Sequence, residues 1–205
     1  MDTSRTDSPA HTSTAASAAG TPAVPPSTPD LYARLREDCA ADWKEYIRHP
    51  FVQQLGAGTL PLPAYQDYLV QDYLYLVQFA RANALAAFTS RRLEDIRASA
   101  QILQNVLDET ELHLEQAAAW GLDRAMVEAT PEKQVTVAYT RYLLDCGLAG
   151  DLLELHVALA PCAIGYAEIG AALASQLAAR PDHPYGRWIA EYSGDGFQDS
   201  AIHRP

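Results

Sequence analysis

The stretch LPAYQDYLVQDYLYLVQFARANALAAF, residues 62–88, decides the fold class of this 205-residue chain. Its apolar and aromatic residues recur every three or four positions, which is the period of an α-helix, and Pro63 falls in the first turn, where proline is tolerated. They occupy more than one stripe of the helix, as is typical at the centre of a bundle. Asp72 lies among them, and a carboxylate in such company requires a hydrogen-bond or charge partner. The stretch therefore predicts a central helix with a partnered carboxylate.

Helical periodicity continues along the chain without a competing strand pattern, so the sequence predicts an all-α bundle. Asp151 and Glu154 form a D-x-x-E capping box at the start of one helix. Pro161 lies inside the same helix and is expected to kink it. The segment FVQQLGAGTLPLP, residues 51–63, is expected to be a loop because it holds two glycines and two prolines. Further helices are predicted over residues 31–47, 93–120, 131–147, 151–179 and 184–192, with a short one after residue 196.

Composition excludes several partners. The net charge is −11, with 15 basic residues against 26 acidic ones, which disfavours nucleic acid and anionic membrane surfaces. No run of 18 apolar residues is present, so no membrane span is expected. Three cysteines without a CxxC spacing indicate a reduced, cytoplasmic protein. Residues 1–29 are rich in Ser, Thr, Ala and Pro and are expected to be a disordered tail, before a single helical domain over residues 30–205.

Asp72 is the first candidate functional residue. It is either a surface or backbone-bonded aspartate, or the acceptor in a binding site. Tyr75 follows three residues later and faces the same way, so the pair would present a carboxylate and a phenol to one cavity.

Cys162 is the second candidate. A reduced cysteine packs as a small hydrophobic side chain, but Cys162 directly follows Pro161, where the helix is distorted, and Tyr166 lies four residues on. A thiol in this position is a possible nucleophile that needs an activating partner. Glu168 lies near enough in sequence to share the region.

Tyrosine is unusually frequent, with eleven residues against four phenylalanines. Tyr139 and Tyr192 add phenols to the candidates above, although most tyrosines are expected at the margin of the core. A pocket of such rings suits a flat heterocycle that stacks and is hydrogen-bonded at its edge.

Glu109 and His113, four residues apart, are the most tempting metal site. A di-iron bundle requires Glu-x-x-His at a spacing of three on two helices, and neither His113 nor His156 has a glutamate there. We expect a Glu–His hydrogen bond that supports the bundle, and no metal. A di-iron oxidase is disfavoured on the same ground.

Six linked segments resemble the TenA/thiaminase II family: HPFVQQLGAGTLP, YLVQDYLYLVQFARANALAA, ELHLEQAAAWGL, AYTRYLL, LAPCAIGYAEIG and WIAEYSGDGF. The resemblance covers roughly residues 31–200. It implies a haem-oxygenase-like all-α fold without haem, a homotetramer and no cofactor. It also implies hydrolysis of 4-amino-5-aminomethyl-2-methylpyrimidine to the 5-hydroxymethyl pyrimidine and ammonia, in thiamin salvage, with cleavage of thiamin itself in many members. The family's older label, transcriptional regulator, finds no support in this acidic chain.

The resemblance also implies roles for individual residues. Cys162 corresponds to the nucleophile, and Asp72 to the residue that binds the 4-amino and ring-nitrogen edge of the pyrimidine. The remaining phenols correspond to residues that contact the ring or orient these groups: Tyr75, Tyr139, Tyr166 and Tyr192. Chemically, a thiolate adds to C6 of the ring, the amine or thiazole leaves the 5-methylene, water adds, and the thiolate departs.

One part of the family pattern has no match. Members continue past GDGF to a terminal helix with a glutamate that acts as acid and base, and no residue of this sequence corresponds to it. The sequence leaves three explanations open. The chain is a truncated version of a longer protein, or Glu168 or a neighbouring subunit replaces the group, or the chain binds thiamin-related pyrimidines without catalysis.

Overall fold

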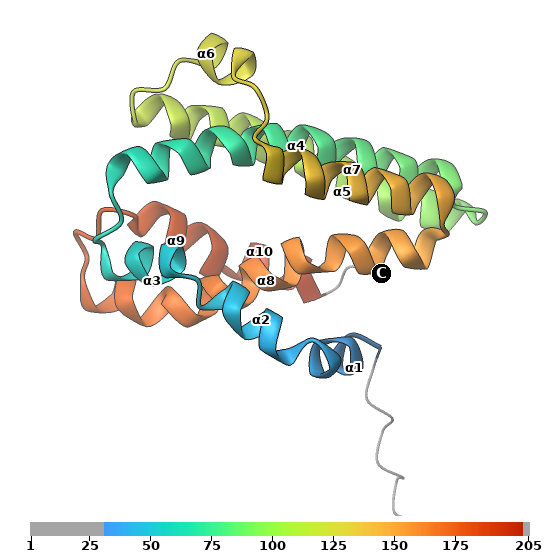
Figure 1. Ribbon diagram of the computed structural model, residues 1–205, viewed down its shortest axis with the longest axis horizontal. Helices are drawn as coiled ribbons and strands as arrows, with labels where there is room; N and C mark the ends of the chain where they lie inside the picture. The colour runs from blue at the N-terminus through green and yellow to red at the C-terminus, as the bar shows by residue number, and fades with distance from the viewer. Residues whose placement is uncertain (1–30, 203–205) are drawn as a thin grey trace, which may run out of the picture. The chain divides into compact units, whose positions relative to one another are not determined.

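The structure, a computed structural model, describes residues 31–202, which form helices without strands (Figure 1). The chain divides after Ala40 into two units. The first unit contributes α1 (Leu31–Asp38), and the second, from Ala41 onward, holds the bundle. The helices of the bundle are α2 (Ala40–Ile47, which starts at the division), α3 (Pro50–Ala57), α4 (Leu62–Thr89), α5 (Leu93–Ala119), α6 (Arg124–Ala129), α7 (Gln134–Ala149), α8 (Leu152–Ala179), α9 (Gly186–Ser193) and α10 (Asp195–Ile202).

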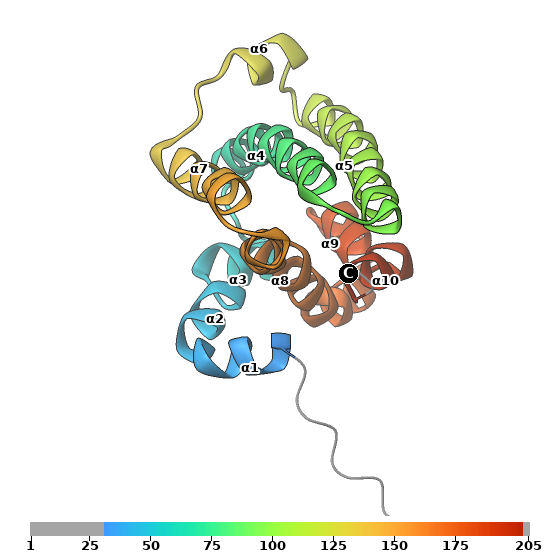
Figure 2. The ribbon, with the colours of Figure 1, turned by 90° about the vertical axis from the view of Figure 1, so that its right-hand side faces the viewer.

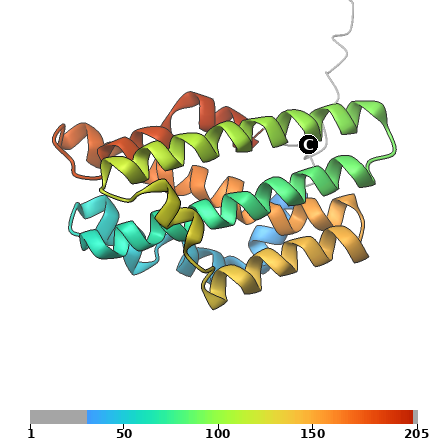
Figure 3. The same cartoon turned by 90° about the horizontal axis from the view of Figure 1, so that it is seen from above.

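Two long helices organise the second unit. Helix α4 packs along α5 on one side and α7 on the other, and α8 packs along α7 and α9. The end-on view shows these helices around a common interior (Figure 2), and the view from above shows α4 and α5 running side by side (Figure 3). The short α10 lies against α8 and α9. The arrangement leaves the inner faces of α4, α7 and α8 directed at one another.

The core consists of two clusters of buried side chains, and α4 and α8 contribute to both. One cluster includes Leu69 of α4 and Ile169 of α8, and the other includes Leu76 of α4 and Leu155 of α8. Truncating one such leucine to alanine costs about 2–5 kcal/mol, so these helices are held firmly. Helix α8 is also long and apolar enough, by length and composition alone, to cross a membrane. Five of its buried residues belong to the core clusters, two to the first and three to the second, as expected for the central helix of a bundle.

The prediction of a loop over residues 51–63 is wrong in its first half, where α3 forms. Pro50 occupies the first turn, and the His49 ring accepts a hydrogen bond from the Phe51 N–H at 3.2 Å, which caps the helix. Gly58 ends it with φ of +69°, a left-handed conformation that glycine adopts without strain. The glycines and prolines therefore mark the ends of a short helix.

Other boundaries differ less. The single helix predicted over residues 31–47 is broken at Cys39. Helix α6 was not predicted, and Asp123 caps it by accepting a hydrogen bond from the Ala125 N–H at 2.9 Å. The long α5 and α8 are confirmed, as is the capping box, since the Asp151 side chain accepts from the Glu154 N–H at 2.9 Å.

Three sequence predictions stay open. Helix α8 continues through Pro161, and the kink there stays a prediction. The predicted tail, residues 1–29, lies outside the described residues. A single domain over residues 30–205 also stays a prediction.

Candidate active site

A cavity of about 370 Å³ opens between α4, α7 and α8. This volume lies in the range of pockets for small organic molecules. Five of its wall residues are tyrosines, and one carboxylate and one thiol join them. The residues that line this main cavity are Tyr46, Tyr68, Gln71, Asp72, Tyr75, Val135, Thr136, Tyr139, Pro161, Cys162 and Tyr166.

Asp72 has the partners that its apolar surroundings require. It is only 8% exposed, and its Oδ2 lies 2.6 Å from His113 Nε2 and accepts from the Tyr68 hydroxyl at 3.0 Å. Its Oδ1 accepts from the Tyr166 hydroxyl at 3.3 Å. Trp188 Nε1 donates to the Tyr68 hydroxyl at 3.0 Å, which fixes that ring in turn. The carboxylate is thus held by groups from α4, α5 and α8.

His113 is the ionisable partner of Asp72. Burial by itself would lower the pKa of His113, but the hydrogen bond and negative charge of Asp72, together with the charge of Glu109, raise it above its usual value. These effects favour the imidazolium form, and when the ring is protonated the two side chains form a buried ion pair between α5 and α4. The predicted hydrogen bond between Glu109 and His113 is present through the Glu109 backbone, and the His113 ring contacts the Asp72 carboxylate as well.

Cys162 lies in α8 directly after Pro161. Its Sγ lies 3.1 Å from the Tyr139 hydroxyl, which also contacts the Ala158 carbonyl oxygen at 2.9 Å. When Cys162 is a thiol, the Tyr139 hydroxyl can donate to the Ala158 carbonyl and accept from the thiol. When Cys162 is a thiolate, the hydroxyl can donate to the sulfur instead. Tyr139 is therefore able to serve both protonation states of Cys162.

Tyr75 completes this corner of the cavity. Its ring stacks on that of Tyr139, with centroids 6.0 Å apart and planes 11° apart. Its hydroxyl is buried and has no hydrogen-bond partner of normal geometry among the described residues. Burial first, and then the charge of a nearby Cys162 thiolate, raise the pKa of both phenols. Each phenol therefore remains a protonated donor next to the sulfur.

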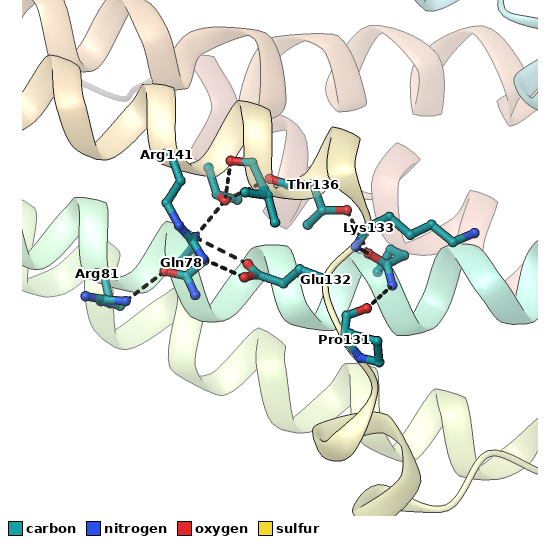
Figure 4. Close-up of polar contacts among 10 residues, drawn as sticks. Gln78, Arg81, Pro131, Glu132, Lys133, Thr136 and Arg141 are labelled. Carbon is teal, nitrogen blue, oxygen red and sulfur yellow. Dashed lines mark hydrogen bonds and ion pairs between the residues drawn. The ribbon is translucent and has the colours of Figure 1, made fainter.

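The loop before α7 is tied to α4 by one side chain. Gln71 Nε2 donates to the Pro131 carbonyl at 3.2 Å, and its Oε1 accepts from the Lys133 N–H at 2.8 Å and the Thr136 hydroxyl at 2.7 Å. Figure 4 shows Pro131, Lys133 and Thr136 gathered there, with Arg141 paired to Glu132 beside them. These bonds place the first turn of α7 at the wall of the main cavity.

Tyr46 closes the cavity from α2. Its hydroxyl donates to the Pro161 carbonyl at 3.3 Å, beside Cys162. Gly165 permits this approach, because a Cβ at that position would collide with the Tyr46 ring. The absence of a side chain at residue 165 therefore allows the Tyr46 hydroxyl to reach the Pro161 carbonyl.

Most predicted site residues meet in this main cavity. Five of the six line it: Asp72, Tyr75, Tyr139, Cys162 and Tyr166. Tyr192 does not; it is buried in α9, with its ring centroid 5.0 Å from that of Tyr166, and it lines a smaller adjoining cavity.

Glu168, the predicted substitute acid, lines neither cavity and accepts from Trp43 Nε1 at 3.0 Å. Within residues 31–202 no group of three or more His, Cys, Asp and Glu side chains is placed to hold a metal ion.

Sequence reasoning missed the contacts that two residues make with the carboxylate. Tyr68 lies four positions before Asp72 on the same face of α4, a spacing that identifies it in retrospect. His113 lies 41 residues away on another helix. Only the packing of α5 on α4 connects it with Asp72, so no local pattern identifies this contact.

The fold and site define a class: an all-α protein whose bundle holds a tyrosine-walled pocket with a partnered carboxylate and a thiol. Residues 36–204 match the TENA/THI-4/PQQC family, and the chain belongs to that family. The TenA resemblance and the all-α fold are thereby confirmed.

Individual relatives agree with this assignment. The chain is 36% identical over 171 residues to the aminopyrimidine aminohydrolase of Halalkalibacterium halodurans, an alignment that covers 82% of this chain and 76% of that relative. It is 42% identical to an uncharacterized protein of Haemophilus influenzae, over 83% of this chain and 80% of the relative. The crystal structure of a TenA family transcription regulator from a Silicibacter species is similar with a TM-score of 0.79 and 38% identity, over 83% of this chain and 75% of the other.

Proposed function

We propose that this protein is a hydrolase of thiamin salvage. It would convert 4-amino-5-aminomethyl-2-methylpyrimidine to the 5-hydroxymethyl pyrimidine and ammonia, and cleave thiamin at the same methylene carbon. The observation that carries the proposal is the presence of a reactive residue type, Cys162, and a buried carboxylate, Asp72, in one tyrosine-lined cavity of single-ring dimensions. The relationship to a named aminopyrimidine aminohydrolase supports the choice of substrate class.

Asp72 is the group that would bind the polar edge of the pyrimidine. Its Oδ1 has one hydrogen bond in the structure, from Tyr166, so it retains capacity to accept from an exocyclic amino group. A carboxylate beside the ring also stabilises a protonated ring nitrogen, and this effect is larger in a pocket without bulk water. The phenols of Tyr75 and Tyr139 would stack against the ring or donate to it.

Cys162 is the nucleophile in this proposal. The thiolate adds to C6 of the ring, the C6–N electron pair moves onto the ring nitrogen, and that nitrogen takes up a proton. The loss of aromaticity allows the amine to leave the 5-methylene carbon. Water then bonds to the methylene carbon and gives up one proton, the ring nitrogen loses its proton, and the thiolate departs. Tyr139 and Tyr75 stand where donors would stabilise the thiolate before and after the addition.

The test is product release by the purified chain from the aminomethyl pyrimidine and, separately, from thiamin. Cys162→Ala is expected to abolish turnover while pyrimidine binding by calorimetry is retained. Cys39→Ala, which changes an exposed cysteine in the first unit, is the matched control and is expected to leave turnover unchanged. Full turnover by Cys162→Ala would refute the mechanism. A tight binding isotherm with no product from the unmodified chain would instead identify a non-catalytic pyrimidine-binding protein.

We further propose a cytoplasmic homotetramer. Large apolar side chains of α4, α7 and α8 are exposed, among them Phe88 at 84%, Leu148 at 74% and Leu153 at 58%. Exposed apolar groups of this size mark surfaces that are covered in an assembly. Light scattering coupled to size exclusion tests the assembly, and a monomeric mass at micromolar concentration would contradict it.

A further inference from the structure

A second cavity of about 30 Å³ adjoins the main one and shares four of its wall residues. A buried water molecule needs about 10–15 Å³ of such volume, so this small cavity has room for about two. The shared wall residues are Asp72, Tyr75, Cys162 and Tyr166. The proposed nucleophile therefore contributes both to a space of ligand size and to a space of water size.

The small cavity contains a carboxylate that the proposed mechanism has not used. Glu109 of α5 is part of its wall, together with Tyr192. The negative charge of Glu109 contributes to raising the pKa of both His113 and Tyr192, which means that the carboxylate lies close to these two buried groups. Glu109 is thus on the inner side of α5, next to the space that Cys162 also lines.

The polar groups around this space suit a water molecule. A buried water typically makes two to four hydrogen bonds to polar groups that would otherwise lack partners. The Tyr75 hydroxyl is buried without a partner of normal geometry among the described residues. It contributes to the same wall as the Glu109 carboxylate and the Cys162 thiol.

We propose that the small cavity holds the water that completes the hydrolysis, and that Glu109 is the base that activates it; this rests on the proposed function. Once the amine has left, the exocyclic methylene is joined to the ring by a double bond conjugated to a cationic nitrogen. The water oxygen bonds to the methylene carbon, the double-bond pair returns to the ring and neutralises that nitrogen, and one water proton passes to the Glu109 carboxylate. Solvent or the released ammonia then takes this proton.

The other carboxylates are less suited to this step. Asp72 already accepts from Tyr68 and Tyr166 and contacts His113. Glu168 lines neither cavity and is bonded to Trp43. Among the described residues, two carboxylates line the small cavity, and Glu109 is the one other than Asp72.

The experiment is a partition measurement on the full chain. Glu109→Gln and the unmodified chain are incubated with the aminomethyl pyrimidine and increasing 2-mercaptoethanol, and hydroxymethyl and thioether products are separated by chromatography. A dissolved thiolate attacks the methylene without a base, whereas water needs one. We expect Glu109→Gln to reduce the hydroxymethyl product by about 100-fold, which is the lower end for loss of a general base, and to reduce thioether formation much less. Glu115→Gln, an exposed glutamate of the same helix, is the control and is expected to leave the ratio unchanged.

A product ratio that does not change in Glu109→Gln, with the unmodified chain hydrolysing normally, overturns the assignment of Glu109 and leaves the proposed function standing. Equal loss of both products has the same meaning. An unmodified chain that yields neither product overturns the proposed function, and the role of Glu109 with it. Should Glu109→Gln fail to fold, Glu109→Asp withdraws the carboxylate by one methylene and is expected to shift the ratio in the same direction.

Discussion

Replacing Asp72 by Asn tests whether the centre of the site is a buried ion pair. The amide keeps the shape of the side chain but removes the charge opposite His113, and its nitrogen cannot accept. Three side chains contact the carboxylate, namely His113, Tyr68 and Tyr166. A hydrogen bond to a charged group exceeds a neutral one by about 1 kcal/mol, so three of them amount to about 3 kcal/mol. This agrees with the roughly 3–5 kcal/mol lost when one partner of a buried ion pair is removed.

Urea unfolding at several pH values measures this loss. At pH 6 we expect the free energy of unfolding of Asp72→Asn to fall by about 3 kcal/mol, against a total of about 5–15 kcal/mol for a domain. The pKa of His113 is raised in the folded protein from an ordinary value of 6.5. The stabilisation from its charge is therefore fully present below pH 6.5 and is lost as the pH rises through the raised value. The difference between Asp72→Asn and the unmodified chain should shrink accordingly toward alkaline pH.

The control for this measurement is Asp67→Asn. Asp67 lies on the same helix but half exposed, paired with Lys133. A surface pair contributes about 0–1 kcal/mol, so little change is expected at any pH. An Asp72→Asn difference that is the same at pH 6 and pH 9 would show that His113 is not charged in the folded protein. A difference as small as that of Asp67→Asn would refute the account of Asp72 as a held, buried carboxylate.

Three further substitutions address the walls of the site. Tyr139→Phe removes the hydroxyl that contacts Cys162 at 3.1 Å, and turnover is expected to fall about 10- to 100-fold, as for loss of one bond to a charged group, with an unchanged melting temperature. Gly165→Ala places a methyl group against the Tyr46 ring and is expected to lower the free energy of unfolding by about 1–3 kcal/mol; an unchanged calorimetric melt would contradict that packing. Gln71→Ala removes two bonds to the loop before α7 and one to the first turn of α7, so we expect faster proteolysis of residues 130–136 and weaker pyrimidine binding; identical cleavage kinetics would show that the loop is held by other contacts.

The fold class could be predicted from sequence because the apolar residues of long amphipathic helices recur every three or four positions over many turns. The two core helices predicted over residues 62–88 and 93–120 differ from the observed α4 and α5 by one residue at their C-terminal ends. The short helices α3 and α6 were not predicted because only a few residues in each can show the helical period. Glycines and prolines that terminate α3 resemble those of a loop, and only the His49 cap and the Gly58 conformation distinguish the two.

The candidate site was predictable where its residues share a helix face or a family motif. Asp72 and Tyr75 were found by spacing, and Cys162 by its position after Pro161. His113 and Glu109 were noticed, but as a pair with each other. What the sequence lacks is the packing of α5 on α4, which aims His113 at Asp72 and places Glu109 in the small cavity.

The tyrosines in the wall of the main cavity influence how the site responds to pH. Four of the main-cavity phenols, those of Tyr68, Tyr75, Tyr139 and Tyr166, have pKa values raised chiefly by burial. They keep their protons well into alkaline solution and should be among the last of the eleven tyrosines to show phenolate absorbance. These four phenols therefore stay uncharged across the physiological range. Any pH dependence of ligand affinity then reports the ligand itself or the few acidic, basic and thiol groups at the site.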